Sequence, residues 1–159
     1  QLTSSNKINL VKIKTGAQMQ KAIMDDYHES DIVIMAAAVC DYRPIEFSKK
    51  KIKKDNKEIN IKFEKTTDIL MELGKKKKNQ ILVGFALENE NELLNAKNKL
   101  KNKNLDLVIL NSLNDYGAGF GFDSNKIYII DKNDKIIKYK LKQKVEVAKD
   151  IFKHIIKLI

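Results

Sequence analysis

Cysteine and histidine are scarce in this 159-residue chain, which limits the sites it can form. Cys40 is the only cysteine, so the sequence excludes an internal disulfide and a cysteine-based metal cluster. His28 and His154 are the only histidines, and their wide separation does not indicate a zinc site. We therefore expect any metal ion to arrive with a bound ligand.

Long apolar runs are also missing. No stretch approaches the roughly 20 apolar residues that cross a bilayer, and residues 1–7 lack the charged start and apolar middle of a signal peptide. The sequence predicts a soluble, cytoplasmic protein without a membrane partner. Its length and its 43% hydrophobic residues suit one domain with a single core.

The chain is basic but has almost no arginine. Arg43 is the only one, so lysine supplies nearly all of the positive charge behind the net charge of +10. Proteins that read nucleic acids depend on arginine forks and on aromatic side chains that stack on bases, whereas charge alone indicates non-specific attraction. We do not expect a nucleic-acid partner, although a non-catalytic basic module that binds nucleotides or nucleic acids stays open as an alternative.

Apolar spacing predicts strands that alternate with helices. The predicted strands cover residues 8–13, 32–39, 59–64, 81–87 and 105–110, followed by a hairpin of residues 127–130 and 136–139. The predicted helices follow the caps at Thr15 and at residues 66–68, cover residues 90–102, and close the chain. The last helix is expected to bury a stripe of Val145, Ala148, Phe152, Ile155 and Ile159. Residues 40–57 show no periodicity and are predicted to form a loop.

This order favours an α/β fold with a doubly wound, mostly parallel, Rossmann-like sheet, a C-terminal β-hairpin and a closing helix. The near-continuous apolar run at residues 32–39 is typical of a central parallel strand that is covered on both faces. Ligands of such sheets bind beyond the carboxyl ends of the strands. The segments after Val39, Leu87 and Leu110 are therefore the places to expect a site.

The first of these segments combines small and charged residues. Three alanines at residues 36–38 leave room for a flat ligand against the backbone, and Asp41 offers a carboxylate to a ribose hydroxyl or to a metal-bound phosphate. The lysine-rich run at residues 49–54 follows, and mobile lysines can neutralise a phosphorus under attack while a flap excludes water. Close helix packing and a solvated charge run are the alternative interpretations.

Other candidate residues lie farther along the chain. The capped helix start at residues 66–70 presents free amides that suit a phosphate, although most caps serve only their own helix. Gly84 in mid-strand indicates a close approach by a ligand or by backbone, and Phe85 could pack on a base or sugar. Lys99 and Lys103 share a helix face. The GAGFG segment at residues 117–121 lacks dinucleotide-fingerprint spacing and no P-loop occurs, which disfavours an oxidoreductase.

Several short segments together resemble, in order and spacing, the phosphopantothenate-cysteine ligase family, also called phosphopantothenoylcysteine synthetase. The matching segments are AAAVCDYRP at 36–44, KIKK at 51–54, KTTDIL at 65–70, VGFALE at 83–88, KNLDLVILN at 103–111 and GFGFDSNKIYII at 119–130. In bacteria this family is often fused behind a flavin-dependent decarboxylase. The resemblance covers nearly the whole chain.

The resemblance implies a ligase of coenzyme A biosynthesis that joins 4'-phosphopantothenate to cysteine through an acyl-nucleotidylate. CTP, or ATP in its place, would be the co-substrate, accompanied by Mg²⁺ whose protein ligands the sequence does not identify. Lys51 matches the flap lysine that assists attack at phosphorus. The matching nucleotide-binding positions are Met35, Ala36, Ala37, Asp41, Lys51, Thr67, Asp68, Ile69, Leu70, Phe85, Lys99 and Lys103. A homodimer and a phosphopantothenoylcysteine decarboxylase, as a domain or a subunit, are the further partners implied.

Some family features differ or are missing. Cys40, Thr67 and Ser112 stand where the family usually has alanine, proline and aspartate. The glycine-rich first strand and turn and the SNRSSG-like segment, which bind phosphopantothenate in the family, do not occur before Ile8. We therefore expect residues 1–159 alone to bind nucleotide weakly, if at all, and to lack turnover.

Overall fold

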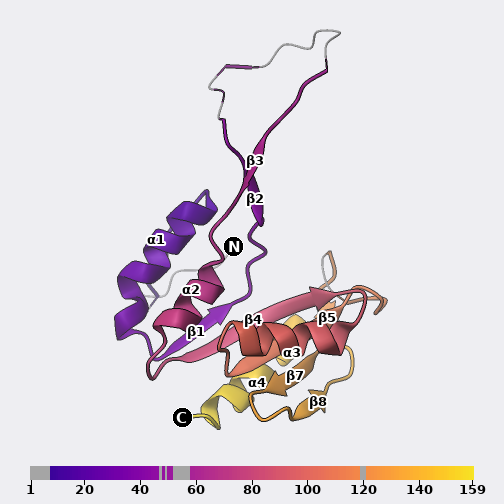
Figure 1. The fold of residues 1–159 in the computed structure, drawn as a ribbon. Helices are drawn as coiled ribbons and strands as arrows, with labels where there is room; N and C mark the ends of the chain where they lie inside the picture. The colour runs from indigo at the N-terminus through magenta and orange to yellow at the C-terminus, as the bar shows by residue number, and fades with distance from the viewer. Residues whose placement is uncertain (1–7, 47, 49, 52–57, 119–120) are drawn as a thin grey trace.

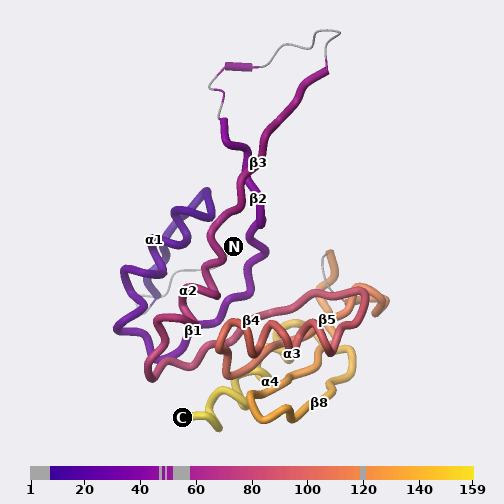
Figure 2. The backbone as a smooth tube through the Cα atoms, in the orientation of Figure 1, coloured from indigo at the N-terminus to yellow at the C-terminus, as the bar shows by residue number. Residues whose placement is uncertain are grey.

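The computed structural model describes residues 8–46, 48, 50–51, 58–118 and 121–159. These residues form an α/β body from which a two-stranded arm projects (Figure 1). The arm pairs β2 (Tyr42–Pro44) with β3 (Phe63–Lys65) in antiparallel fashion. The backbone trace in Figure 2 shows that the arm extends well beyond the body.

The body is built on a sheet of five strands in the described residues, in the order β1-β4-β5-β7-β8. Three strands run parallel, namely β1 (Ile32–Met35), β4 (Ile81–Glu88) and β5 (Leu107–Ser112). The hairpin of β7 (Tyr128–Asp131) and β8 (Ile136–Lys138) adds to β5 in antiparallel orientation. The expected fold class is thereby confirmed, including the C-terminal hairpin. A separate small ribbon pairs β6 (Ser124–Asn125) with β9 (Lys142–Gln143).

Helices cover both faces of this sheet. On one face, α2 (Ile69–Lys76) and α3 (Glu92–Asn102) pack on an apolar cluster with Leu82, Val108 and Leu110, which α1 (Gly16–Asp26) and the 3-10 turn Tyr27–Glu29 extend. On the other face, α4 (Lys144–Ile156) packs on Val83, Leu107, Ile109, Ile127 and Ile129. The caps fit their predictions, because Thr15 forms a capping box with Gln18 and Asp68 accepts the amide of Met71. Among the described residues, no helix is long and apolar enough to cross a membrane.

The structure corrects the predictions for the first half of the chain. Residues 8–13 form no strand, and Ile8 and Leu10 are exposed. The apolar run at 32–39 is strand only to Met35, and β1 is an edge strand of the described sheet, not a central one. The predicted loop at 40–57 contains β2, which pairs with the following strand. Period-2 alternation was visible only in the second strand of this ribbon, so the first was missed.

The predicted stripe of α4 is also wrong. Val145, Phe152 and Ile159 are exposed, as is Ala148, and of the five predicted residues only Ile155 is buried. The sheet instead buries Val147, Ile151 and Ile155. Two apolar stripes lie side by side on this helix, and periodicity alone does not tell which of them faces the sheet.

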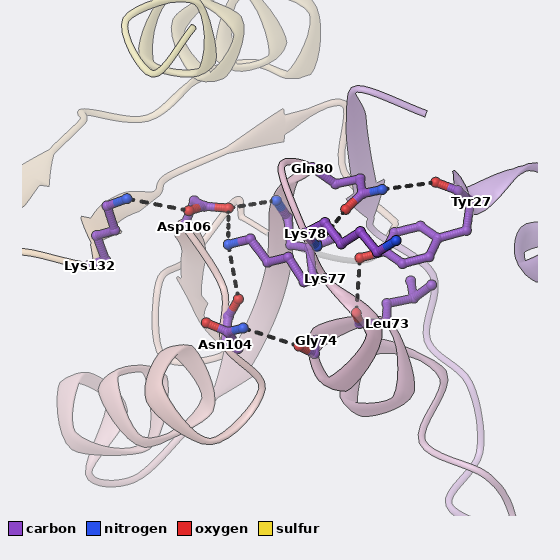
Figure 3. Close-up of polar contacts among 10 residues, drawn as sticks. Tyr27, Leu73, Gly74, Lys77, Lys78, Gln80, Asn104, Asp106 and Lys132 are labelled. Atoms are coloured by element: carbon purple, nitrogen blue, oxygen red, sulfur yellow. Dashed lines mark hydrogen bonds and ion pairs between the residues drawn. The ribbon is translucent and has the colours of Figure 1, made fainter. Parts of the chain in front are cut away.

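A polar network joins the elements at the amino ends of β4 and β5 (Figure 3). The buried Asp106 carboxylate accepts the amide of Leu82 at 2.8 Å and the ammonium of Lys77 at 2.5 Å, and Lys132 lies 3.8 Å away. Lys77 also donates to the Asn104 carbonyl at 3.2 Å. The end of α2, β4, β5 and the residues after β7 therefore meet on one side chain.

The Asp106→Ala variant tests how much this network contributes to the stability of the fold. It leaves the Lys77 ammonium, whose side chain is 12% exposed, without its carboxylate partner. We expect the free energy of unfolding to fall by about 3 kcal/mol in urea denaturation, because a buried charge loses its partner. Asp25→Ala is the control, since Asp25 pairs with Lys21 on the surface and should cost less than about 1 kcal/mol. Equal losses in the two variants would contradict this account.

Candidate functional site

A cavity of about 670 Å³ lies at the carboxyl ends of the parallel strands, where a doubly wound sheet is expected to bind its ligand. Segments from both faces of the sheet contribute to its wall. The lining residues are Met35–Asp41, Thr66–Leu70, Phe85, Leu87, Lys99, Lys103, Asn111, Asn125, Lys144, Val147, Ala148 and Ile151. All of the predicted nucleotide-binding residues except Lys51 are in this set.

The loop after β1 forms one side of the cavity. Ala36, Ala37 and Ala38 are exposed, so short side chains leave their backbone amides and carbonyls accessible. Thr66 fixes the end of this loop, because its hydroxyl donates to the Cys40 carbonyl at 2.5 Å and its amide donates to the Asp41 carbonyl at 2.8 Å. The Asp41 carboxylate is therefore carried on an anchored loop.

The start of α2 forms the adjacent wall. The Asp68 carboxylate caps the helix through the amide of Met71 at 3.0 Å and pairs with the Lys103 ammonium at 2.6 Å. Burial alone would raise the pKa of Asp68, but the hydrogen bonds from Lys103 and Met71 and the charges of Lys103 and Lys99 outweigh it and lower the pKa. Asp68 is therefore a stable anion beside a lysine.

Lys99 lies in the last turn of α3, one turn before Lys103, which caps the end of this helix, and it reaches the same cavity. Its ammonium donates to the Phe85 carbonyl at 2.6 Å. Burial lowers the pKa of Lys99, the charge of Lys103 lowers it further, and the carboxylates of Glu88, Asp68 and Asp41 oppose these effects. Two restrained cations therefore share one wall, an arrangement suited to a ligand with several negative charges.

Gly84 and Phe85 face opposite sides of β4. A Cβ on Gly84 would lie 2.8 Å from side-chain atoms of both Leu70 and Leu105. The glycine therefore makes room for the packing of α2 and the turn after α3, not for a ligand. Phe85 lies on the other face, packs against the cluster beneath α4 and lines the cavity.

Sequence reasoning missed the far side of the cavity, formed by Asn111, Asn125 and Lys144. Asn111 is only 8% exposed, yet within the described part of the chain its carboxamide makes no hydrogen bond. Lys144 begins α4, and no side chain caps this helix start. The signal for Asn111 was its position directly after Leu110, at a strand end where a site was expected.

The arm holds the remaining predicted residues. Lys51 is exposed and does not line the cavity, while Lys49 and residues 52–54 of the lysine run lie outside the described residues. Arg43 pairs with Glu64 across the arm at 2.7 Å. In the GAGFG segment, Gly119 and Phe120 also lie outside the described residues.

Comparison with known proteins gives a consistent family assignment for this chain. The family model for the DNA/pantothenate metabolism flavoprotein C-terminal domain matches residues 1–159. The chain is 39% identical over 145 residues to the coenzyme A biosynthesis bifunctional protein CoaBC of Bacillus subtilis strain 168, covering 91% of this chain and 36% of that protein. It is 52% identical over 157 residues to a protein of an unknown prokaryotic organism named cysteine/cysteine sulfinic acid decarboxylase, covering 98% of this chain and 44% of that protein.

A solved structure agrees with these relatives. The crystal structure of the C-terminal domain of a coenzyme A biosynthesis bifunctional protein CoaBC superposes with a TM-score of 0.77 at 32% identity, covering 97% of this chain and 67% of that one. The Rossmann-like fold is therefore shared. The chain spans less than half the length of the curated relatives it matches.

Proposed function

The chain belongs to the family of the DNA/pantothenate metabolism flavoprotein C-terminal domain, and we propose from this premise that it takes part in joining 4'-phosphopantothenate to cysteine. The observation that carries the proposal is the cavity wall in which Lys99 and Lys103, the start of α2 and the Asp41 loop converge. Such a wall suits the triphosphate of a nucleotide, because fixed cations and helix amides stabilise phosphate charge without rearrangement.

The proposed reaction has two steps. The carboxylate of 4'-phosphopantothenate attacks the α-phosphorus of the nucleotide, and the bond to the departing pyrophosphate breaks. The amine of cysteine then attacks the acyl carbon, nucleotide monophosphate leaves and the amine loses a proton, giving 4'-phosphopantothenoylcysteine. Lys99 and Lys103 bind the triphosphate, while the open backbone at Met35–Ala37 and the ring of Phe85 contact base and ribose. We propose CTP as the nucleotide, with ATP as the alternative.

Mg²⁺ fits this site as a companion of the nucleotide. Among the described residues, no cluster of three or more histidine, cysteine, aspartate or glutamate side chains could hold a metal ion by itself. Mg²⁺ bound to nucleotides commonly takes only one or two carboxylates and completes its shell with phosphate and water. Asp41 is the candidate ligand, since the Asp68 carboxylate is engaged by Lys103. When bound, the ion would neutralise phosphate charge.

The other side of the cavity suits the acid substrate. An unpaired carboxamide at Asn111, the uncapped start of α4 and the ammonium of Lys144 offer hydrogen-bond donors and positive charge to an anion. We place 4'-phosphopantothenate along this side. Its carboxylate would then meet the nucleotide within the same cavity.

The partners of the chain follow from its relatives and from its arm. The bifunctional relatives extend beyond the shared region, so we propose a decarboxylase domain or subunit as a partner.

A second copy of the chain is proposed to cover the arm. Tyr42 and Phe63 lie on one face, which Ile61 and Ile59 continue, and all four are 55% or more exposed. Arg43 and Glu64 occupy the opposite face. An isolated two-stranded ribbon is marginal in water, and a symmetric contact would bury its apolar face.

Pyrophosphate release by the complete gene product tests the ligase proposal. With CTP or ATP, 4'-phosphopantothenate and Mg²⁺, we expect pyrophosphate release. We propose that Lys51, which lies outside the cavity wall in the structure, reaches the attacked phosphorus from the arm, so Lys51→Gln should lower this release by about 100-fold or more. Lys62→Gln removes one lysine from the same arm and should retain activity. If both variants keep full activity, Lys51 has no role in the attack at phosphorus. If wild type releases no pyrophosphate, the chain fits the non-catalytic basic module instead.

Alkylation of Cys40 tests nucleotide binding without turnover. Cys40 is exposed and lines the cavity, so bound nucleotide should shield it from iodoacetamide. At a nucleotide concentration ten times Kd, mass action predicts about ten-fold slower modification by intact-protein mass spectrometry. The control is Cys40→Ala combined with Ile45→Cys, which moves the thiol to the arm and should react at a rate that nucleotide does not change. Unprotected Cys40 would contradict the placement of the nucleotide.

The oligomeric state tests the role of the arm. We expect wild type to have twice the 18.3 kDa chain mass in size-exclusion chromatography with light scattering, and Ile61→Lys to have the single-chain mass. A charge on the apolar face would be buried without a partner in the dimer. Lys62→Gln lies on the opposite face and should remain dimeric. A wild type that stays monomeric at about 100 µM would exclude this interface, since that concentration saturates contacts of micromolar Kd.

A further inference from the structure

We infer that Asp68 is a positioning residue for phosphate recognition, which holds the ammonium of Lys103 at the cavity wall while it caps α2. The inference rests on the proposed nucleotide-binding function. It differs from a direct nucleotide contact, because Asp68 acts through Lys103. An anion placed beside a phosphate site otherwise opposes binding, so its presence in this wall needs a physical reason.

The two carboxylate oxygens of Asp68 contact different partners. One accepts the amide of Met71 at 3.0 Å, and the other pairs with the Lys103 ammonium at 2.6 Å. An ammonium has three donors, and this pairing uses one of them. The Lys103 side chain is 20% exposed, so its head group is held at the wall and keeps donors for a ligand in the cavity.

Asp68 also completes a symmetrical arrangement of the two lysines. Lys99 in α3 and Lys103 at its C-cap are one turn apart and repel each other. The Phe85 carbonyl fixes Lys99 at 2.6 Å, while Asp68 fixes Lys103 from α2. Each cation therefore has an acceptor on a different element, and their separation is set before a ligand arrives. A preset pair avoids the loss of side-chain freedom that binding otherwise costs.

The substitution Asp68→Asn separates positioning from two simpler roles. Asparagine caps helices as well as aspartate does, so the start of α2 should persist. Its single side-chain oxygen is then used by the Met71 amide, and Lys103 is released. If Asp68 were only a nearby negative charge, its removal would tighten the binding of a polyanion. If it positions Lys103, the same removal weakens binding, so the sign of the effect decides between them.

The experiment measures the Kd of the magnesium complexes of CTP and ATP by isothermal titration calorimetry, on wild type and variants of the complete gene product. With the nucleotide that binds wild type more tightly, we expect Asp68→Asn to raise Kd about five-fold, the factor that corresponds to freeing one long side chain. Glu72→Gln is the matched control. It removes the same charge from the same helix, where Glu72 pairs with Lys75, and should leave Kd unchanged within about two-fold.

A double-mutant cycle with Lys103→Met completes the test. Asp68→Asn should add little to the Kd of Lys103→Met, because the residue through which it acts is already gone. Equal or tighter binding by Asp68→Asn, or full additivity in the cycle, would overturn the inference. A wild type that binds neither nucleotide would instead overturn the proposed function. Thermal unfolding checks that both variants remain folded, and a folded Asp68→Asn with weaker binding supports positioning over a structural role.

Discussion

The buried carboxylate of Asp106 is the contact on which the arrangement of this molecule depends. It accepts the Leu82 amide and the Lys77 ammonium, and the Asp106 amide donates back to the Leu82 carbonyl at 2.9 Å. These bonds fix β5 beside β4 and hold the end of α2 against both strands. A buried carboxylate is costly unless it is fully paired, so the network permits few alternative positions for these elements.

The Asp106 network also affects the position of the cavity wall, because α2 connects the two. At about 1.5 Å per residue, this helix of eight residues spans about 12 Å between its two ends. Asp68 caps its start and pairs with Lys103, while Lys77 follows its end and pairs with Asp106. Both partners belong to the short connection from α3 to β5. The acidic residue stands at the helix N-terminus and the basic one at the C-terminus, so both ion pairs also agree with the helix dipole.

The sequence was most informative where local signals were strong and agreed with each other. Thr15 and Asp68 cap helices as predicted, and the apolar run at 81–87 is a buried strand. The predicted cavity residues converge because they follow strand ends, which a doubly wound sheet brings to one edge. Roles that tertiary contacts decide could not be predicted. Which apolar stripe of α4 faces the sheet depends on the shape of the sheet, and the edge position of β1 depends on its neighbours.

Asn111 shows why one half of the site escaped prediction. Neither its type nor its spacing distinguishes it from the many other asparagines of the chain; only its low exposure in the cavity wall marks it. Its side of the cavity nevertheless matters for the proposed chemistry. Two reacting groups must approach to about 3–3.5 Å in a defined orientation. A single cavity that is lined by Lys99, Lys103, the loop after β1 and the start of α4 can hold both reactants at once. A ligase that activates one substrate with another needs this geometry, whereas a module that only binds nucleotide needs just one wall.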